Sequence, residues 1–429
     1  MKWRNQLLAL CCLLVFLALG VLYFENWVVQ KPFGIILFVG EGLDPARLAI
    51  ARIYAADAAT PLNLDSLSYT ALLKNYSADS TTPDQAAAAT ALATGVKVKN
   101  GAIGMSADGK SLENLIQLAR QSGRMTALVT DTLLTDATAA SFYAHTTSKD
   151  DRQSLASQLV ENADIDVVLG GGAADFIPAS KGGRRTDERD LLSELQEAGY
   201  DLVQNAEELE EVPRWRRAKL FGLFSQAELA FANDDEARTN QPTLADMVRR
   251  SVELLQFNRG GYLLVVHAGL MRRAAERNDA ERTLLQTIEL DRAVAVATEY
   301  AGTKSTIMVC GDVSVGGMNL SGFAPRDASG AIWLGSDSAS GPSLTWASGP
   351  KGKTPAELAN ERAPIEPSNP NADAAWLPPE AALEPAVIYA AVAREAASDM
   401  IALGSGLGAD ALHGTLESTR IFDIIQDNL

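Results

Sequence analysis

The chain has 429 residues, of which 47% are hydrophobic, and a formal net charge of -17. This length and apolar content suffice for one large domain with a buried core, so a chain that is disordered throughout is excluded. The acidic excess lacks the basic clusters that bind phosphate groups, which excludes nucleic acid and anionic membrane surfaces as partners of the soluble part.

The N-terminal segment is predicted to direct export. Lys2 and Arg4 precede an uncharged apolar run at residues 7–24. A run of this length spans a membrane, and its basic flank stays cytoplasmic, so the rest of the chain would be anchored facing the periplasm or the cell exterior. The alternative is a signal peptide cleaved after Gly20, which would release a secreted protein. Residues 1–24 are therefore a signal anchor or a signal peptide, and the anchor is favoured because apolar residues continue past Gly20.

From residue 33 onward, short apolar runs alternate with amphipathic stretches. The alternation predicts an α/β fold with a mostly parallel central sheet and helices on both faces. The predicted strands are residues 33–40, 125–131, 166–172, 261–269, 305–312 and 399–406. The predicted helices include residues 111–123, 244–257 and 281–302.

A polar site is expected at one edge of this sheet. Sites in such sheets lie beyond the carboxyl ends of the strands. Glu41, His267 and Asp312 lie at the ends of three predicted strands. Residues of about 320–385 are instead rich in Gly, Ser, Pro and Ala without periodicity, which predicts an irregular surface insertion.

Six segments, in order along the chain, resemble the alkaline phosphatase family. They are FVGEGLDPARLAIARIY, TTPDQAAAATALATGVKVKNGAIGM, TDATAASFYAHTTSK, VVHAGLMRRAAE, CGDVSVGG and ALHGTLESTRIFDII. The resemblance covers nearly all of the chain after residue 33. It implies an alkaline-phosphatase-like three-layer sandwich at residues 33–429, with the insertion at about 320–385 inside it, and it implies a homodimer.

The resemblance also implies a set of site positions. Alkaline phosphatases use a serine nucleophile between two zinc ions, a nearby magnesium ion, and an arginine that holds the phosphate. In this chain the serine position is held by Gln85 and the arginine position by Lys149. The magnesium positions are held by Glu41, Asp136, Thr138 and His267, and Glu41 also stands where the family bridges magnesium to zinc. The zinc positions are held by Asp312, Val313, Arg272, Glu276 and Glu395.

These substitutions change the expected chemistry. The carboxamide of Gln85 neither ionises nor attacks phosphorus at useful rates, so the covalent route is closed. An arginine is always protonated and has no lone pair for a metal ion, so zinc is not expected. We predict instead an ion-pair network in which Arg272 and Arg273 neutralise Glu276 and Glu395 where zinc would stand, because uncompensated buried carboxylates are prohibitively costly.

Several alternatives remain open at these positions. Gln85 is equally compatible with a solvated or capping amide in the first turn of a helix. Arg272 and Arg273 are compatible with an ordinary charged face. A single Mg²⁺ or Mn²⁺ is a candidate ligand of one acidic cluster, and the alternative for that cluster is a set of hydrogen bonds in which His267 bridges two carboxylates. The cluster consists of Glu41, Asp136, Thr138, His267 and Asp312.

Two candidate functions follow from these substitutions. The first is a catalytically degenerate phosphatase homologue with a binding or structural role outside the cytoplasm. The second is a divergent metal-dependent phosphomonoesterase or phosphodiesterase in which one metal activates water and Lys149 holds phosphate. The alanine-rich run after Gln85 is expected to persist as a close-packed helix, with its N-terminus available to an anion. The sequence identifies no ligand.

Overall fold

The structure is a computed structural model that describes residues 2–23, 31–56, 59–162, 164–214, 219–322, 343–354, 357 and 386–429. Within these residues, a ten-stranded sheet has the order β16-β2-β15-β8-β1-β7-β3-β4-β6-β5. Its strands are β1 (Gly34–Gly40), β2 (Tyr69–Lys74), β3 (Met125–Leu133), β4 (Val167–Gly171), β5 (Asp201–Val203), β6 (Leu220–Leu223), β7 (Tyr262–Ala268), β8 (Thr306–Gly311), β15 (Met400–Ser405) and β16 (His413–Glu417).

The sheet is mostly parallel, as predicted. Only β15 among these strands runs antiparallel to its neighbours, β2 and β8. Every residue of the central strands β1, β3, β7 and β8 is buried, which explains why they read as continuous apolar runs. Side chains of β1 alternate between the two faces of the sheet, so Ile36 and Phe38 join one core while Ile35 and Leu37 join the other.

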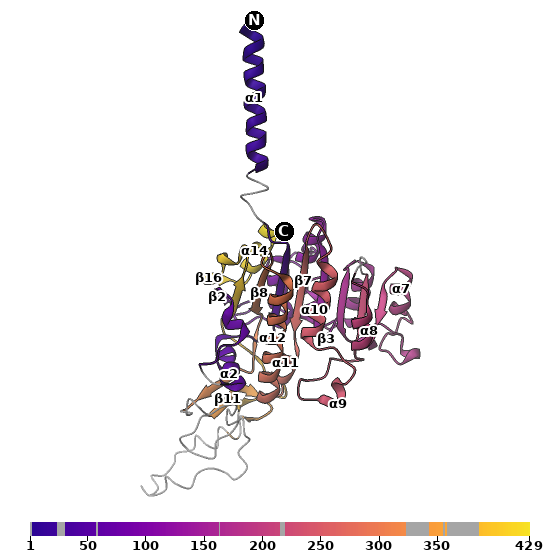
Figure 1. Cartoon of the computed structure of the whole chain (residues 1–429). Helices are drawn as coiled ribbons and strands as arrows, with labels where there is room; N and C mark the ends of the chain where they lie inside the picture. The colour runs from indigo at the N-terminus through magenta and orange to yellow at the C-terminus, as the bar shows by residue number, and fades with distance from the viewer. Residues whose placement is uncertain are drawn as a thin grey trace.

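Helices cover both faces and complete a three-layer α/β fold (Figure 1). The first core is packed by α2 (Pro45–Ala55), α8 (Ala206–Glu211), α10 (Leu244–Leu255), α11 (Leu270–Ala275) and α12 (Ala280–Ala301). The second is packed by α3 (Gln85–Thr94), α4 (Leu115–Gln121), α5 (Ala137–Ala140), α6 (Arg152–Glu161), α7 (Leu191–Glu197) and α14 (Arg420–Asn428). Shorter helical segments are η2 (Asn63–Ser66), η3 (Ala173–Asp175), η4 (Ala179–Lys181), α9 (Asp235–Arg238) and η5 (Ala409–Ala411).

Most of the expected irregular insertion at about 320–385 lies outside the described residues. Its described part is not irregular, because β10 (Asn319–Ser321), β11 (Ser343–Gly349), β12 (Gly352–Lys353) and β13 (Ala386–Tyr389) form a four-stranded sheet. Leu344 and Trp346 are fully buried, whereas Thr345 and Ala347 are more exposed. Burial thus alternates with a period of two residues, as in a strand. The Gly, Ser, Pro and Ala content of the region made this alternation hard to recognise in the sequence. A separate pair joins β9 (Ser314–Val315) to β14 (Glu395–Ala396).

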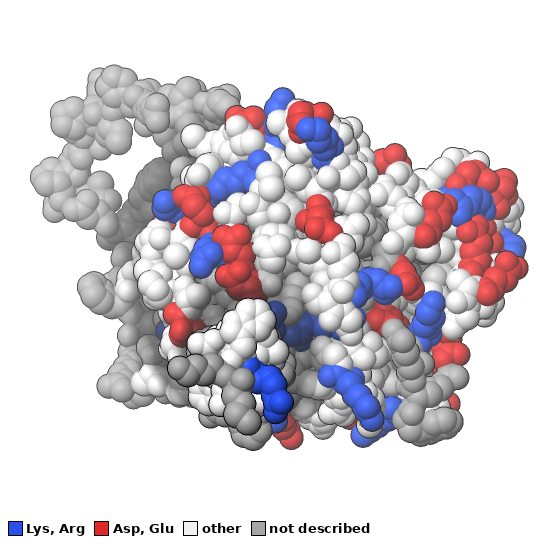
Figure 2. All heavy atoms as spheres, turned by 90° about the horizontal axis from the view of Figure 1, so that it is seen from above, with Lys and Arg blue, Asp and Glu red and all other residues white. Residues whose placement is uncertain are grey.

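The N-terminal run forms helix α1 (Lys2–Tyr23), which stands clear of the α/β domain in Figure 1. Its segment Trp3–Gly20 has a mean hydropathy of 1.6 and no buried share, so by length and composition α1 could cross a membrane. A signal sequence has the same properties. Figure 2 views the domain from the side of α1 and shows acidic and basic side chains interspersed on that face.

Helix α3 is closely packed beside the site. All of its residues are buried. The Asp84 side chain caps its N-terminus by accepting a hydrogen bond from the Ala87 backbone, and Gly95 ends it in a left-handed conformation with φ of 70°. A Cβ at Gly95 would lie 2.6 Å from the Phe422 ring, so α14 closes over the helix end. Small side chains therefore allow α3 to lie close to its neighbours.

We expect Ala89→Leu to lower the free energy of unfolding by roughly 1–3 kcal/mol, because Ala89 is fully buried and a larger side chain would overpack the helix. The matched control is Ala55→Leu in α2, where the alanine is exposed. Chemical denaturation of both variants measures the difference. Equal effects at the two positions would contradict the close packing of α3.

Candidate functional site

Four neighbouring strands, β8, β1, β7 and β3, direct polar residues to one edge of the sheet. Glu41 follows β1, Asp312 follows β8, His267 lies near the end of β7, and Asp136 follows β3 shortly before α5. All four side chains are buried. The structure therefore brings together residues that are far apart in the sequence, at the edge where parallel sheets place their sites.

Gln85 lies at the centre of this cluster. It is the first residue of α3, only 6% of it is exposed, and its Nε2 donates to both Glu41 Oε1 and Asp136 Oδ1. The amide is therefore neither solvated nor capping the helix, since Asp84 is the cap. Both amide hydrogens are used to hold two carboxylates together, which is a structural task that a serine hydroxyl, with one hydrogen, could not perform.

Glu41 Oε1 is a shared acceptor. Thr138 Oγ1 lies 2.7 Å from it and 3.2 Å from Asp312 Oδ2. His267 Nε2 lies 3.1 Å from the same Glu41 oxygen, an electrostatic contact without hydrogen-bond alignment, while its Nδ1 lies 2.9 Å from Thr130 Oγ1. Gln85 thus bridges the two carboxylates, whereas His267 contacts only Glu41 of the pair.

Nearby carboxylates favour the protonated form of the His267 imidazole. Burial is the largest single effect and lowers its pKa, but Glu41, Asp136 and Asp131 together outweigh burial and raise the pKa of His267 to about 9. Burial, together with Glu41, raises the pKa of the Asp312 carboxyl to about 7. Asp312 Oδ1 accepts from the backbone N–H groups of Gly42 at 3.2 Å and Val313 at 2.6 Å.

Arg272 joins two acidic residues from different parts of the chain. Its Nε lies 2.8 Å from Glu276 Oε1 and its Nη2 lies 2.9 Å from Glu395 Oε1, while only 8% of the arginine side chain is exposed. Glu395 reaches the site because β14 pairs with β9 in a register that sets it opposite Val315. Burial lowers the pKa of Arg272, but the surrounding carboxylates, Glu41 first, raise it above its usual value.

Arg273 makes a second set of ion pairs. Its Nη2 lies 2.5 Å from Asp136 Oδ2, and its Nη1 lies 3.4 Å from Glu276 Oε2. Its Nε lies 3.4 Å from Glu228 Oε1, a carboxylate that no motif in the sequence identified. Burial raises the pKa of the Asp136 carboxyl, but the positive charges of Arg273 and His267 outweigh burial and lower it. Arg273 is therefore bound to a residue that was expected as a metal ligand, rather than to Glu395.

Arg47 is a further cation that the sequence did not reveal. It is 1% exposed, and its Nη1 donates to the Glu41 backbone carbonyl at 2.8 Å. Burial lowers its pKa, and the charges of Asp44, Asp312 and Glu41 oppose that effect. The available signal was helical spacing, because Arg47 lies three and four residues before the buried Ile50 and Ala51 and so shares their face.

Lys149 lies at the rim of the site. Its Nζ is 2.8 Å from Asp84 Oδ2, and the same oxygen accepts from the Gly101 backbone at 2.9 Å. Because the Asp84 carboxylate caps α3, the N-terminus of this helix already has an internal anion. This carboxylate would compete with an external anion, and the expected anion site at the N-terminus stays a prediction.

The residues do not fit a pair of zinc ions. The guanidinium of Arg272 cannot ligate a metal and is bonded to both Glu276 and Glu395. A single hard cation is a closer match, since Glu41, Asp136 and His267 each offer one ligand atom within 4.8 Å of the others. Hydrogen-bond donors already occupy this cluster, because Gln85 donates to both carboxylates and Arg273 donates to Asp136.

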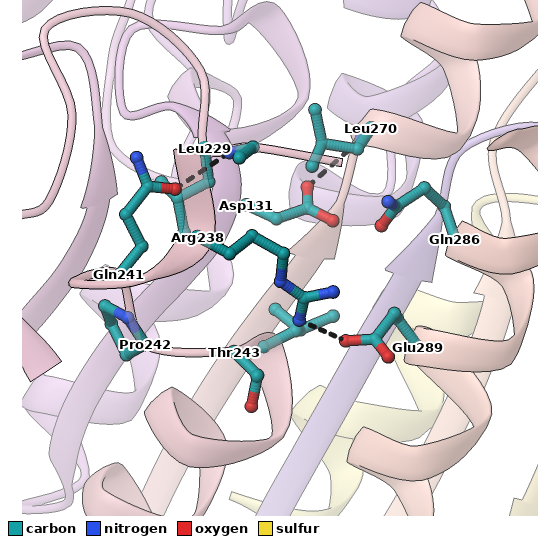
Figure 3. A pocket seen from close by; sticks show the side chains of 11 residues that line it. Asp131, Leu229, Arg238, Gln241, Pro242, Thr243, Leu270, Gln286 and Glu289 are labelled. Atoms are coloured by element: carbon teal, nitrogen blue, oxygen red, sulfur yellow. Dashed lines mark hydrogen bonds and ion pairs between the residues drawn. The ribbon is translucent and has the colours of Figure 1, made fainter. Parts of the chain in front are cut away.

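A small cavity lies beside Asp131 and the start of α11 (Figure 3). Its volume of about 20 Å³ has room for about one water molecule, so it cannot hold a substrate. Asp131, on its wall, accepts from the backbone N–H groups of Gly269 at 2.7 Å and Leu270 at 3.1 Å. Burial raises the pKa of Asp131 to about 6. These bonds fix the start of α11, the helix that carries both site arginines.

Comparison with known proteins identifies alkaline phosphatases among the relatives of this chain. The family model described as alkaline phosphatase matches residues 34–427. Alkaline phosphatase H of Pseudomonas aeruginosa is 30% identical over 65% of this chain and 68% of its own length. The tissue-nonspecific alkaline phosphatase of Gallus gallus is 27% identical over 68% of this chain and 65% of its own length. The chain thus spans about two-thirds of the length of these curated relatives.

Solved structures show the same fold. Thermus thermophilus alkaline phosphatase has a TM-score of 0.71 and 23% identity, covering 93% of this chain and 92% of that one. A mutant alkaline phosphatase from the Antarctic bacterium TAB5 also has a TM-score of 0.71, with 18% identity, covering 93% and 98%. At these identities the likeness establishes the fold alone, an alkaline-phosphatase-like α/β fold with a large, mostly parallel sheet.

We expect Arg272→Ala to lower the free energy of unfolding near neutral pH by up to roughly 3–5 kcal/mol, because it removes the positive charge that faces the buried Glu41 and the partly buried Glu276 and Glu395. Protonation would relieve their repulsion, so the deficit should shrink as the pH falls. The control is Arg420→Ala, which breaks only an exposed pair with Asp423 and should cost under about 1 kcal/mol. If Arg272→Ala matches this control from mildly acidic to neutral pH, the ion-pair network does not stabilise the site.

The raised pKa of His267 predicts a second pH dependence. Its pKa rises from 6.5 to about 9 on folding, so the stabilisation is fully present below pH 6.5 and is lost as the pH rises through 9. We expect His267→Gln to be less stable than the parent at pH 6.5, by a few kcal/mol, and the difference to narrow toward pH 9. Denaturant unfolding across this range measures it, and a deficit independent of pH would exclude a charged His267.

Proposed function

The chain belongs to the alkaline phosphatase family, and from this premise we propose that it is a catalytically degenerate member with a binding or structural role outside the cytoplasm. Family membership by itself would favour a hydrolase. Function, however, depends on the site rather than on the fold. The proposal therefore rests on the chemistry of the residues at the carboxyl edge of the sheet.

The observation that carries the proposal is the position of the Arg272 guanidinium. It is hydrogen-bonded to Glu276 at 2.8 Å and to Glu395 at 2.9 Å, and all three residues hold positions that the family resemblance assigns to zinc ligands. A guanidinium contributes positive charge without a vacant coordination position, so it can stabilise the acidic residues but cannot polarise a phosphate ester as a Lewis acid. The ion-pair network would thus preserve the fold and not the reaction.

Two further positions support the proposal. Gln85 stands at the nucleophile position and donates both amide hydrogens to carboxylates, so it offers a phosphate neither an attacking atom nor a free donor. Lys149 stands at the position of the phosphate-binding arginine but is paired with Asp84 at 2.8 Å. An incoming phosphate would have to compete with that carboxylate for the ammonium group and would face the nearby acidic residues.

The second candidate is a hydrolase that uses one metal ion. The observation in its favour is the cluster of Glu41, Asp136 and His267, which brings three potential ligand atoms together. Mg²⁺ or Mn²⁺ bound there would supply an activated water molecule. For this to occur, the amide of Gln85 and the guanidinium of Arg273 would have to leave the carboxylates that they now contact. We therefore rank this function second.

The proposed location is outside the cytoplasm, with the uncleaved α1 as a membrane anchor. Support comes from the exposed apolar segment Trp3–Gly20 and from the basic residues that precede it. A mature chain that begins at Val21 in a soluble fraction would replace the anchor with secretion.

We expect the full chain, purified in detergent, to contain no stoichiometric zinc and to hydrolyse a chromogenic phosphomonoester no faster than the buffer does. Gln85→Ser should not restore hydrolysis, because a serine without zinc ions lacks activation. Elemental analysis and the assay, repeated with added Zn²⁺, Mg²⁺ and Mn²⁺, measure both properties. Two tightly bound zinc ions per chain would overturn the proposal. Hydrolysis that requires Mn²⁺ or Mg²⁺ and is abolished by His267→Ala would establish the second candidate.

A further inference from the structure

The chain that follows α1 is fixed to the amino end of the sheet. The Phe33 backbone N–H donates to the Lys304 carbonyl at 2.7 Å, and its carbonyl accepts from the Tyr262 backbone N–H at 3.1 Å. The Phe33 and Tyr262 rings also pack edge to face, with centroids 5.8 Å apart. Tyr262 begins β7 and Lys304 lies just before β8, so the point where the chain enters the domain is at the amino ends of two central strands.

A buried arginine strengthens this attachment and takes no part in the candidate site. Arg124 is 7% exposed and donates to three backbone carbonyls, those of Pro32, Phe33 and Asn428, each at 3.0 Å. Lys31 Nζ adds a hydrogen bond to the Leu429 carbonyl at 2.6 Å. The entering chain and the end of α14 are thus held together at the amino end of the sheet, as Figure 1 shows.

From this geometry we infer that the amino end of the sheet faces the bilayer and that the candidate site opens toward the aqueous phase on the opposite side of the domain. The inference rests on the proposed membrane anchor. It deepens the proposed location, because it makes the candidate site accessible from the aqueous phase rather than from the membrane.

Chain length limits the other orientations. Residues 24–30 connect α1 to the fixed Lys31, and the eight steps from Tyr23 to Lys31 span at most about 29 Å when fully extended. The strand β1 has seven residues and is about 20 Å long, and the site lies beyond its far end. Turning the site toward the bilayer would require the connection to run fully extended along the whole height of the domain.

The surface at the amino end is consistent with this placement. Phe257, in the turn between α10 and β7, is 62% exposed, and aromatic side chains are favoured at the membrane interface. The face seen in Figure 2 carries charges of both signs. The attachment of the chain, rather than attraction to anionic lipid, therefore sets the orientation.

Energy transfer to labelled lipids tests the inference. The full chain with Cys11→Ser and Cys12→Ser, which retains only the buried Cys310, would carry a donor dye at Phe257→Cys or, as the matched position, at Asn319→Cys. Asn319 is exposed and begins β10, beyond the carboxyl end of β8. Each protein is reconstituted into vesicles that contain a headgroup-labelled acceptor lipid.

We expect the protein to float with the vesicles and the transfer efficiency to be several-fold higher from position 257 than from position 319. Equal or reversed efficiencies in protein that floats would overturn the orientation and leave the anchor standing. Protein that remains at the bottom of the gradient would overturn the anchor, and the orientation with it. Neither flotation nor energy transfer depends on bound metal or on phosphatase activity. Finding zinc or phosphatase activity in the protein would therefore refute the functional proposal without changing the result of this experiment.

Discussion

The structure of the site depends on one interaction, the pairing of the buried Arg272 guanidinium with the carboxylates of Glu276 and Glu395. Acidic residues collected at the end of a parallel sheet repel one another and lose their hydration, which costs several kcal/mol per charge unless a positive charge lies among them. Arg272 supplies that charge from the first turns after β7, and Arg273 does the same for Asp136. Removing Arg272 is the most costly change, because both glutamates lose its charge, whereas Arg272 keeps one carboxylate partner when a single glutamate is removed.

Under the proposed function, the same arrangement explains how the fold persists without the reaction. The Gln85 amide ties Glu41 to Asp136, and the alanines that follow it keep α3 against its neighbours. Below the site, Asp131 holds the backbone at the start of α11, so the arginines are presented from a fixed helix. In the proposed function, the arginines and the Gln85 amide therefore stabilise the acidic residues at the positions that the family resemblance assigns to metal ligands.

Much of the fold was predictable, because the central strands are continuous apolar runs and the helices between them have regular spacing. The convergence of Glu41, His267 and Asp312 followed from the rule for strand ends. Side-chain partners were less predictable, because ion pairs join residues that are far apart in the sequence. No motif near Glu228 indicates its pairing with Arg273. Arg47 lies in an ordinary amphipathic helix pattern that does not reveal its contact with Glu41. The strand Ser343–Gly349 was missed because Gly and Ser masked its alternation.

The most direct test of the account is a double-mutant cycle between Arg272 and Glu395, measured by the free energy of unfolding of the parent, Arg272→Ala, Glu395→Gln and the double variant. If the guanidinium compensates the carboxylate, the damage of Arg272→Ala should be partly relieved once Glu395 is neutral. The coupling free energy should then lie in the upper part of the range of about 0.5–3 kcal/mol found for residues in contact. Strictly additive effects would show that the two charges do not stabilise each other and would contradict the central claim.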